Sequence, residues 1–187
     1  ATNAGELVYR LGAAEGLYYA DTIERQRRGR PADDDRNRRR CGGYIVWKYN
    51  DSWPQIYSGK VDFFLEPYMP YYAIRRAYAP VLVSIEIGSY ISVWVVNDSV
   101  EQIAGTLTVR LFHMDENAVT KEVSRQVAVK PDASTPSIRL DKVGIGSFRK
   151  EHVIHAELVD TAGRPMARAS ALVDIDRRLV FPDAELT

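Results

Sequence analysis

The 187-residue sequence contains a single cysteine and no long apolar run, and each scarcity excludes a class of protein. Because Cys41 has no second cysteine to pair with, neither an internal disulfide nor a cysteine-based metal site can form within one chain. No apolar stretch approaches the roughly 18 residues that a membrane-spanning helix requires. The first residues show no basic segment followed by an apolar core, so we predict no signal peptide there. Composition alone does not fix the compartment.

An excess of charge of either sign is also missing. The 25 lysines and arginines are balanced by 25 aspartates and glutamates, so no overall field attracts nucleic acid or an acidic membrane surface. Arginines cluster between Arg25 and Arg40, but Asp33–Asp35 neutralise part of this charge and no aromatic residues alternate with it. We predict a solvated connection there, and neither nucleic acid nor a membrane as a partner.

Residues that would hold a metal or a phosphate group are scarce as well. The sequence has three histidines, of which His152 and His155 lie three positions apart on an alternating strand. Such residues point to opposite faces, which excludes shared coordination. The glycines of Gly144–Gly146 are not followed by a helical pattern, so they do not resemble a phosphate loop. We predict no metal site and no cofactor.

The N-terminal part of the chain has the pattern of a helix, a buried strand and a second helix. Apolar spacing predicts a helix over residues 6–28, which Gly29 ends. Residues 44–49 form a short apolar run without alternation, as in a strand that is buried on both faces of a parallel sheet. A second helix is predicted over residues 70–78, with Pro70 at its first position. This order of elements is an α/β signal.

The pattern changes after Pro80 to short, alternating apolar segments separated by turns. Seven strands are predicted, over residues 81–87, 90–96, 105–114, 119–129, 137–140, 153–159 and 167–175. Their number and a domain length of about 100 residues are typical of an immunoglobulin-like antiparallel β-sandwich. We therefore place the domain boundary between residues 79 and 80.

A cluster of aromatic and polar residues follows the predicted strand at residues 44–49. Its members are Trp47, Tyr49, Asn50, Asp51, Trp53 and Tyr57. In parallel α/β folds, ligands bind at the carboxyl ends of the strands, where this cluster falls. Indole faces can stack on sugar rings, while amides and carboxylates bind the hydroxyls. The alternative is that Trp47 and Trp53 are large core residues at a domain junction.

The same segment carries the motif Trp-x-x-Asn-Asp-x-Trp-Pro, here as Trp47, Asn50, Asp51, Trp53 and Pro54. It is followed at matching spacing by Tyr71, Tyr72, Ala73, Arg75, Arg76 and the run Ala79–Val81. In these features the chain resembles the end of the catalytic barrel in glycoside hydrolase family 2, particularly its β-mannosidase-like and exo-β-glucosaminidase-like branches. The closing stretch, residues 156–186, is similar to the C-terminal sandwich of that family.

Two departures from the family pattern stand out. Many members have a Gly-Arg-Trp-Lys-like stretch where this chain has Leu65, Glu66, Pro67 and Tyr68. A glutamine commonly follows the first tryptophan of the motif, and Lys48 replaces it here. Both departures leave the sugar specificity open.

The resemblance implies a retaining mechanism run by two glutamates on other barrel strands, which we expect before Ala1. No catalytic residue is therefore predicted within this chain. Trp47 would form the floor of the sugar subsite, and Trp53 would shape its rim. Asn50 and Asp51 would either anchor the loop or reach sugar hydroxyls. Asp51 as a local general acid is disfavoured because no second carboxylate lies close in sequence.

Two hypotheses follow. In the first, residues 1–79 are the last helix–strand–helix of a (β/α)8 barrel and residues 80–187 an immunoglobulin-like sandwich, together the C-terminal part of a retaining β-glycosidase. This parent would hydrolyse O-glycosidic bonds of β-mannosides or related β-glycosides, and a periplasmic or extracellular location fits it. The fragment alone is predicted to be inactive. In the second hypothesis, the chain is a non-catalytic module that binds carbohydrate or supports another domain, with Tyr90 and Trp94 as an aromatic platform.

A physical difficulty accompanies the first hypothesis. A strand over residues 44–49 that is apolar on both faces needs a neighbour on each side. Without these neighbours it exposes backbone edges and apolar side chains. We therefore expect residues 1–79 to fold back on the sandwich, to pair between chains through residues 44–49, or to aggregate.

Overall fold

The computed structural model describes residues 3–29, 43–55, 59–141 and 151–173. The chain divides into two compact units, Ala1–Pro80 and Val81–Thr187, which we call the N-terminal unit and the sandwich unit. Each is described by itself. The arginine-rich stretch from residue 30, together with Cys41, Tyr57 and Gly144–Gly146, lies outside the described residues.

The long helix α1 (Ala4–Arg28) confirms the helix predicted over residues 6–28 and begins two residues earlier. It begins there because the Asn3 side chain accepts a hydrogen bond from the Glu6 N–H at 2.9 Å, which satisfies one of the free donors of the first turn. Glu6 lies in the first turn and basic side chains lie in the last, so the charges complement the helix dipole. No helix among the described ranges is long and apolar enough to cross a membrane.

The second helix, α2 (Met69–Ala77), confirms the prediction over residues 70–78 and has Pro70 in its first turn. It packs closely on α1 because two glycines of α1 face it. A Cβ atom on Gly12 would lie 3.3 Å from the Met69 Cβ, and one on Gly16 would lie 3.3 Å from the Ala73 Cβ. At the other end of this contact, the buried Arg27 donates hydrogen bonds to the carbonyl oxygens of Ala77 and Ala79. These bonds satisfy carbonyl groups that the end of α2 would otherwise leave unpaired.

The prediction of a strand over residues 44–49 is wrong for this structure. These residues form no strand, and the nearest ladder contact is an isolated parallel bridge between Asn50 and Val61. Ile45, in the middle of the segment, is 90% exposed. The physical reason is that a strand buried on both faces needs a partner on each side, and the described residues supply none.

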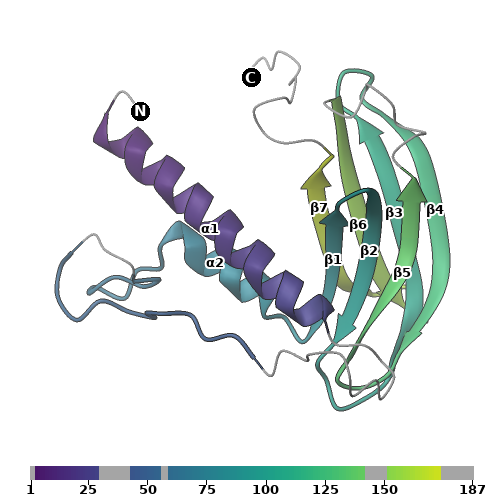
Figure 1. Ribbon diagram of the computed structural model, residues 1–187, viewed down its shortest axis with the longest axis horizontal. Coiled ribbons are helices and arrows are strands. Elements are labelled where there is room, and N and C mark those ends of the chain that lie inside the picture. The colour runs from purple at the N-terminus through teal and green to yellow at the C-terminus, as the bar shows by residue number, and fades with distance from the viewer. Residues whose placement is uncertain (1–2, 30–42, 56–58, 142–150, 174–187) are drawn as a thin grey trace. The chain divides into compact units, whose positions relative to one another are not determined.

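The sandwich unit consists of two antiparallel sheets (Figure 1). The first has the strand order β1-β2-β5 and the second the order β4-β3-β6-β7. The strands are β1 (Val81–Ile87), β2 (Tyr90–Asn97), β3 (Ile103–His113), β4 (Ala118–Val129), β5 (Ala133–Asp141), β6 (His152–Asp160) and β7 (Pro165–Leu172). All seven predicted strands are present, which confirms the immunoglobulin-like β-sandwich.

The core of this unit lies between the two sheets and follows the predicted alternation. On β3, the inward residues Leu107, Val109 and Leu111 are buried, and the residues between them are less so. They pack against buried residues of both sheets, including Val83, Ile91, Val93, Val95, Ile138, Ile154, Ala156 and Leu158. Gly105 is required on β3 because a Cβ atom there would lie 2.0 Å from the Val159 carbonyl oxygen.

The three histidines lie on this unit as the alternation predicts. His152 is buried and His155 is not, so the two point to opposite faces of β6. His113 lies directly opposite His152 in the ladder, with ring centroids 4.6 Å apart. Among the residues that the structure describes, no group of three potential ligands is placed to hold a metal ion.

The turn between β6 and β7 depends on one carboxylate. Asp160 accepts hydrogen bonds from the N–H groups of Ala162 and Arg164, each at 2.8 Å, and from the Arg164 Nε at 2.7 Å. The Arg164 N–H contributes most to holding the pKa of Asp160 below its ordinary value of 3.8. A lowered pKa in the folded state means that the carboxylate stabilises the fold above pH 3.8, and that this contribution is lost as the pH falls through the lowered value.

We therefore expect Asp160→Ala to lower the free energy of unfolding at about pH 7, and the difference from the unaltered chain to be smaller at about pH 2. Urea unfolding at both pH values measures this. Asp115→Ala, at an exposed aspartate in the turn after β3, is the control and should change little. If Asp160→Ala lowered the free energy of unfolding equally at both pH values, the stabilising role of the ionised Asp160 carboxylate would be contradicted.

Candidate functional site

The loop that carries the predicted site residues is held by backbone hydrogen bonds to a neighbouring segment. The Asp51 N–H donates to the Val61 carbonyl oxygen at 3.1 Å. In return, the N–H groups of Lys60 and Val61 donate to the Tyr49 carbonyl oxygen at 2.7 and 3.0 Å. Residues 49–51 and 60–61 thus form one short bridged pair, and the side chains on either side of it are placed by this pair.

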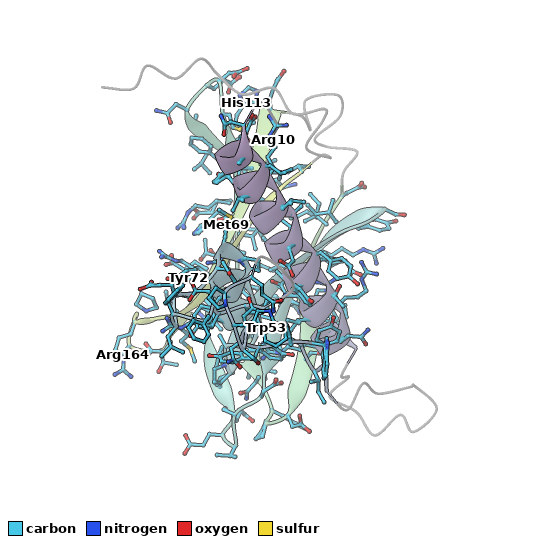
Figure 2. All side chains as sticks on the ribbon, turned by 90° about the vertical axis from the view of Figure 1, so that its left-hand side faces the viewer. Arg10, Trp53, Met69, Tyr72, His113 and Arg164 are labelled. Atoms are coloured by element: carbon cyan, nitrogen blue, oxygen red, sulfur yellow. The ribbon has the colours of Figure 1, made fainter. Side chains whose placement is uncertain are left out.

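The two tryptophans of the motif lie on the surface. Trp47 is 81% exposed and Trp53 is 61% exposed, and Asn50 between them is also exposed. The Tyr19 hydroxyl of α1 donates to the Trp47 carbonyl oxygen at 3.3 Å, and the Trp47–Lys48 peptide bond is cis. Figure 2 labels Trp53 among the side chains of the N-terminal unit. The indole faces are therefore available to a ligand, which is the arrangement that stacking on a sugar ring requires.

Asp51 differs from its neighbours because its side chain is buried. The residue is only 2% exposed, and its Oδ1 atom binds the Lys48 Nζ at 3.0 Å and accepts from the Gln55 Nε2 at 2.8 Å. The Oδ2 atom has no hydrogen-bond partner among the described residues. The hydrogen bond from Lys48 is the largest contribution that holds the pKa of this carboxyl below its ordinary value of 3.8. Asp51 is thus an internal anion of the loop.

Lys60 connects the loop to α1. Its side chain is buried, its ammonium group pairs with Glu15, and the Nζ lies 4.5 Å from the centre of the Tyr19 ring. Burying an ammonium group is unfavourable unless it is paired, and the carboxylate and the aromatic face provide that pairing. The loop is therefore fixed to α1 through both Tyr19 and Lys60.

Further aromatic rings continue from the loop onto α2. The centres of the Tyr49 and Tyr71 rings lie 6.5 Å apart in an edge-to-face arrangement, and the centres of the Tyr71 and Tyr72 rings lie 5.4 Å apart. Tyr72 is exposed and is labelled in Figure 2.

Downstream of the loop, Asp62 accepts hydrogen bonds from the N–H groups of Phe64 and Glu66, each at 2.8 Å, which closes a turn.

The sequence analysis did not predict the roles of three residues that build the loop. Gln55 supplies a donor to Asp51, Lys48 supplies the ion pair, and Gly59 leaves the space in which the carboxylate lies. The i+4 spacing of Asp51 and Gln55 and the isolated glycine before Lys60 are the available signals. Neither is specific without coordinates, because both patterns are common in loops.

The predicted aromatic platform of the sandwich unit, Tyr90 and Trp94, is also present in the structure. Tyr90 and Trp94 lie on the same outward face of β2, as predicted. The Arg139 guanidinium lies 3.4 Å from the centre of the Tyr90 ring, and the Trp94 Nε1 donates to Glu86 at 3.0 Å. One face of the tyrosine ring and the indole N–H are therefore already engaged by neighbouring side chains.

Comparison with known proteins finds similarity over much of the sandwich unit. Residues 89–174 match the family model described as a mannosidase Ig/CBM-like domain. Among curated proteins, β-mannosidase B of Thermothelomyces thermophilus is 27% identical over 151 residues, which are 68% of this chain and 18% of that protein. β-Mannosidase B of Aspergillus niger is 29% identical over 136 residues. The chain therefore spans less than a fifth of the length of these relatives.

Solved structures agree on the fold. The β-D-mannosidase of Dictyoglomus thermophilum matches with a TM-score of 0.80 and 20% identity, over 97% of this chain and 21% of that chain. The exo-chitosanase CsxA of Amycolatopsis orientalis matches with a TM-score of 0.77 and 17% identity, over 91% and 20% of the two chains. Together the comparisons confirm the predicted resemblance to the C-terminal part of a family 2 glycoside hydrolase.

One departure from the family pattern has a structural consequence. Leu65, which stands where many members have glycine, has a φ angle of 67°, in the left-handed region. That conformation costs a leucine about 1–2 kcal/mol, while glycine adopts it freely but loses about 0.5–1 kcal/mol more conformational entropy on folding. Because the relief is at least as large as the entropy cost, Leu65→Gly should raise the free energy of unfolding of the N-terminal unit by about 0–1.5 kcal/mol.

Phe64→Gly, at the adjacent exposed position, is the matched control. It gains no relief from the left-handed region and loses the edge-to-face contact with Phe63, whose ring is 5.3 Å away. We expect it to lower the free energy of unfolding by about 1 kcal/mol. Denaturant unfolding followed by tryptophan fluorescence compares the two. Equal destabilisation by both substitutions would show that residue 65 is not strained.

Proposed function

We propose that this chain is the C-terminal portion of a retaining β-glycosidase that hydrolyses β-mannosides or related β-glycosides. In this proposal the N-terminal unit is the C-terminal end of a (β/α)8 barrel, and residues 44–49, which form no strand here, would take up a strand only beside the other barrel strands. The observation that carries it is the loop with two exposed tryptophans on either side of Asn50 and a buried Asp51. The family match of the sandwich unit and the β-mannosidase relatives support it.

The exposure of the N-terminal unit supports the barrel assignment. Sixteen of the twenty exposed large apolar side chains among the described residues lie in Ala1–Pro80. Only three of the 21 buried apolar residues lie there, namely Ile23, Val61 and Ala77. A unit of this kind has its apolar side chains outside and little core of its own. Such a surface is typical of a segment that packs against further protein.

The energetic scale of this exposure is large. Fully burying a leucine- or isoleucine-sized side chain contributes about 1.5–3 kcal/mol, so covering ten such residues is worth roughly 15–30 kcal/mol before entropy is counted. The outward residues of α1, including Leu7, Leu11, Leu17 and Tyr18, and the residues of the loop would be covered by the other strands and helices of the barrel.

Within the proposed site, each residue has a distinct task. Trp47 forms the floor against the apolar face of the sugar, Trp53 shapes the rim, and Asn50 reaches a hydroxyl group. The buried Asp51 anchors the loop. The two glutamates of the retaining mechanism would come from other barrel strands, about 5 Å apart across the scissile bond, so this chain alone would bind without cleaving.

The second candidate is a non-catalytic sandwich module that binds carbohydrate through Tyr90 and Trp94. The mannosidase Ig/CBM-like family description favours keeping it. The engagement of Tyr90 by Arg139 and of Trp94 by Glu86 argues against it, because a ligand would have to displace these contacts.

A sugar titration separates the two candidates. We expect β-mannan or chitosan oligosaccharides to change the tryptophan fluorescence of the chain at millimolar concentration. Trp47→Ala should abolish this response, because the stacking surface is removed, while Trp94→Ala should preserve it. Loss of the response on Trp94→Ala instead would favour the sandwich module. The absence of any response in the unaltered chain would count against both candidates.

The exposed loop also leads us to propose that the isolated chain self-associates through residues 44–49. Ile45 and Trp47 present apolar surface, and the backbone of this segment is not paired in a ladder. We expect sedimentation velocity to detect concentration-dependent dimers or larger species, and Ile45→Lys to shift the chain toward monomer by placing a charge on the contact. Val100→Lys, at an equally exposed valine of the sandwich unit, is the control. A chain that stays monomeric at all concentrations would refute the proposal.

A further inference from the structure

The Asp51 carboxylate connects the two ends of the segment that carries both tryptophans. Lys48 directly follows Trp47, and Gln55 lies two residues after Trp53. Both side chains bind the same oxygen, Oδ1, at 3.0 and 2.8 Å. A single buried atom thus closes residues 48–55 into a ring, and the backbone at Trp53 and directly after Trp47 is restrained by charged hydrogen bonds. Such bonds are roughly twice as strong as neutral ones.

The position of this carboxylate is set by the glycine beneath it. A Cβ atom built on Gly59 would lie 2.6 Å from the Cγ, the Oδ1 and the Oδ2 of Asp51. Three equal distances mean that the carboxylate lies flat over the Gly59 Cα, where no other residue type leaves room. The backbone hydrogen bond from the Asp51 N–H to the Val61 carbonyl oxygen holds the segment around Asp51 close to the segment around Gly59. The glycine is needed here for close approach, since its φ is not in the left-handed region.

The Asp51 side chain does not face a ligand. It is fully buried, whereas Trp47, Asn50 and Trp53 around it are exposed. Asp51 would therefore affect a bound ligand only indirectly, through the positions of Trp47 and Trp53.

We propose that Asp51 is a positioning residue, whose carboxylate, seated on Gly59, ties Lys48 to Gln55 and thereby restrains the backbone that presents Trp47 and Trp53 to a sugar. This proposal rests on the proposed function for the nature of the ligand, while the fixing of the tryptophans stands on the contacts alone. The proposal also explains the lysine at position 48, whose ammonium group donates a hydrogen bond to the Asp51 carboxylate. A glutamine at this position, as in many members of the family that the chain resembles, would also be a donor.

The test uses the full chain labelled with 5-fluorotryptophan, whose three tryptophans give three ¹⁹F resonances. Substituting each tryptophan in turn assigns the resonances. Gly59→Ala should displace the carboxylate and shift or broaden the Trp47 and Trp53 signals. The Trp94 signal should stay in place and report that the sandwich unit is folded. Gly43→Ala is the matched control, since a Cβ atom there meets nothing within 4 Å.

A second pair of variants keeps the proposal testable if Gly59→Ala does not fold. Lys48→Gln retains a donor for Asp51 and should leave the Trp47 and Trp53 signals close to those of the unaltered chain. Lys48→Met removes the donor at similar length and should shift both signals. Equal spectra for these two variants, or unchanged Trp47 and Trp53 signals in folded Gly59→Ala, would overturn the proposal.

Titration of the same samples with a β-mannan or chitosan oligosaccharide separates this proposal from the proposed function. We expect Gly59→Ala and Lys48→Met to weaken binding on the order of tenfold, and Gly43→Ala and Lys48→Gln to leave it within twofold. If the fluorine signals shift as expected but the unaltered chain binds neither sugar, the sugar assignment fails while the fixing of the tryptophans stands. Full affinity in Gly59→Ala, with its signals shifted, would show that the arrangement of the tryptophans does not control binding.

Discussion

The apolar surface that the N-terminal unit does not cover by itself is the constraint on which the rest of the structure depends. The apolar run at residues 44–49 is irregular, with Ile45 and Trp47 exposed, and in the proposed function it would lie between two further strands. The same reasoning applies to α1, which buries a face of small residues against α2 while several of its leucines remain exposed. The sandwich unit is the opposite case, because each sheet covers the apolar face of the other and its core needs no further partner.

Against this background, the order within the loop at residues 47–55 is informative. Exposed segments are usually mobile, yet this one is held by Tyr19, Lys60 and Val61 from outside and by the buried Asp51 from within. Burying a carboxylate is unfavourable unless it is paired, and here the partners Lys48 and Gln55 lie within the same loop. A binding surface whose side chains are fixed in advance loses less entropy when a ligand is bound.

The sequence predicted the elements whose signal is local. Alternation located all seven strands of the sandwich, and apolar spacing with capping residues located both helices. It failed at residues 44–49, because an apolar run indicates a strand only when partners exist, and partners are not a property of the run. It also left open whether Asp51 anchors the loop or reaches a sugar hydroxyl. Whether a carboxylate is buried depends on contacts such as that with Gly59, eight positions away, which no spacing rule reports.

The most direct test of the central claim is to determine the coding sequence upstream of the Ala1 codon. The account predicts that the reading frame continues through alternating strands and helices of a barrel, with a glutamate at the end of each of two strands. A polypeptide with that upstream segment should hydrolyse an aryl β-mannoside or a related β-glycoside. An upstream frame that encodes no barrel strands with glutamates, or a start of translation at Ala1, would contradict the claim and leave a binding or supporting role.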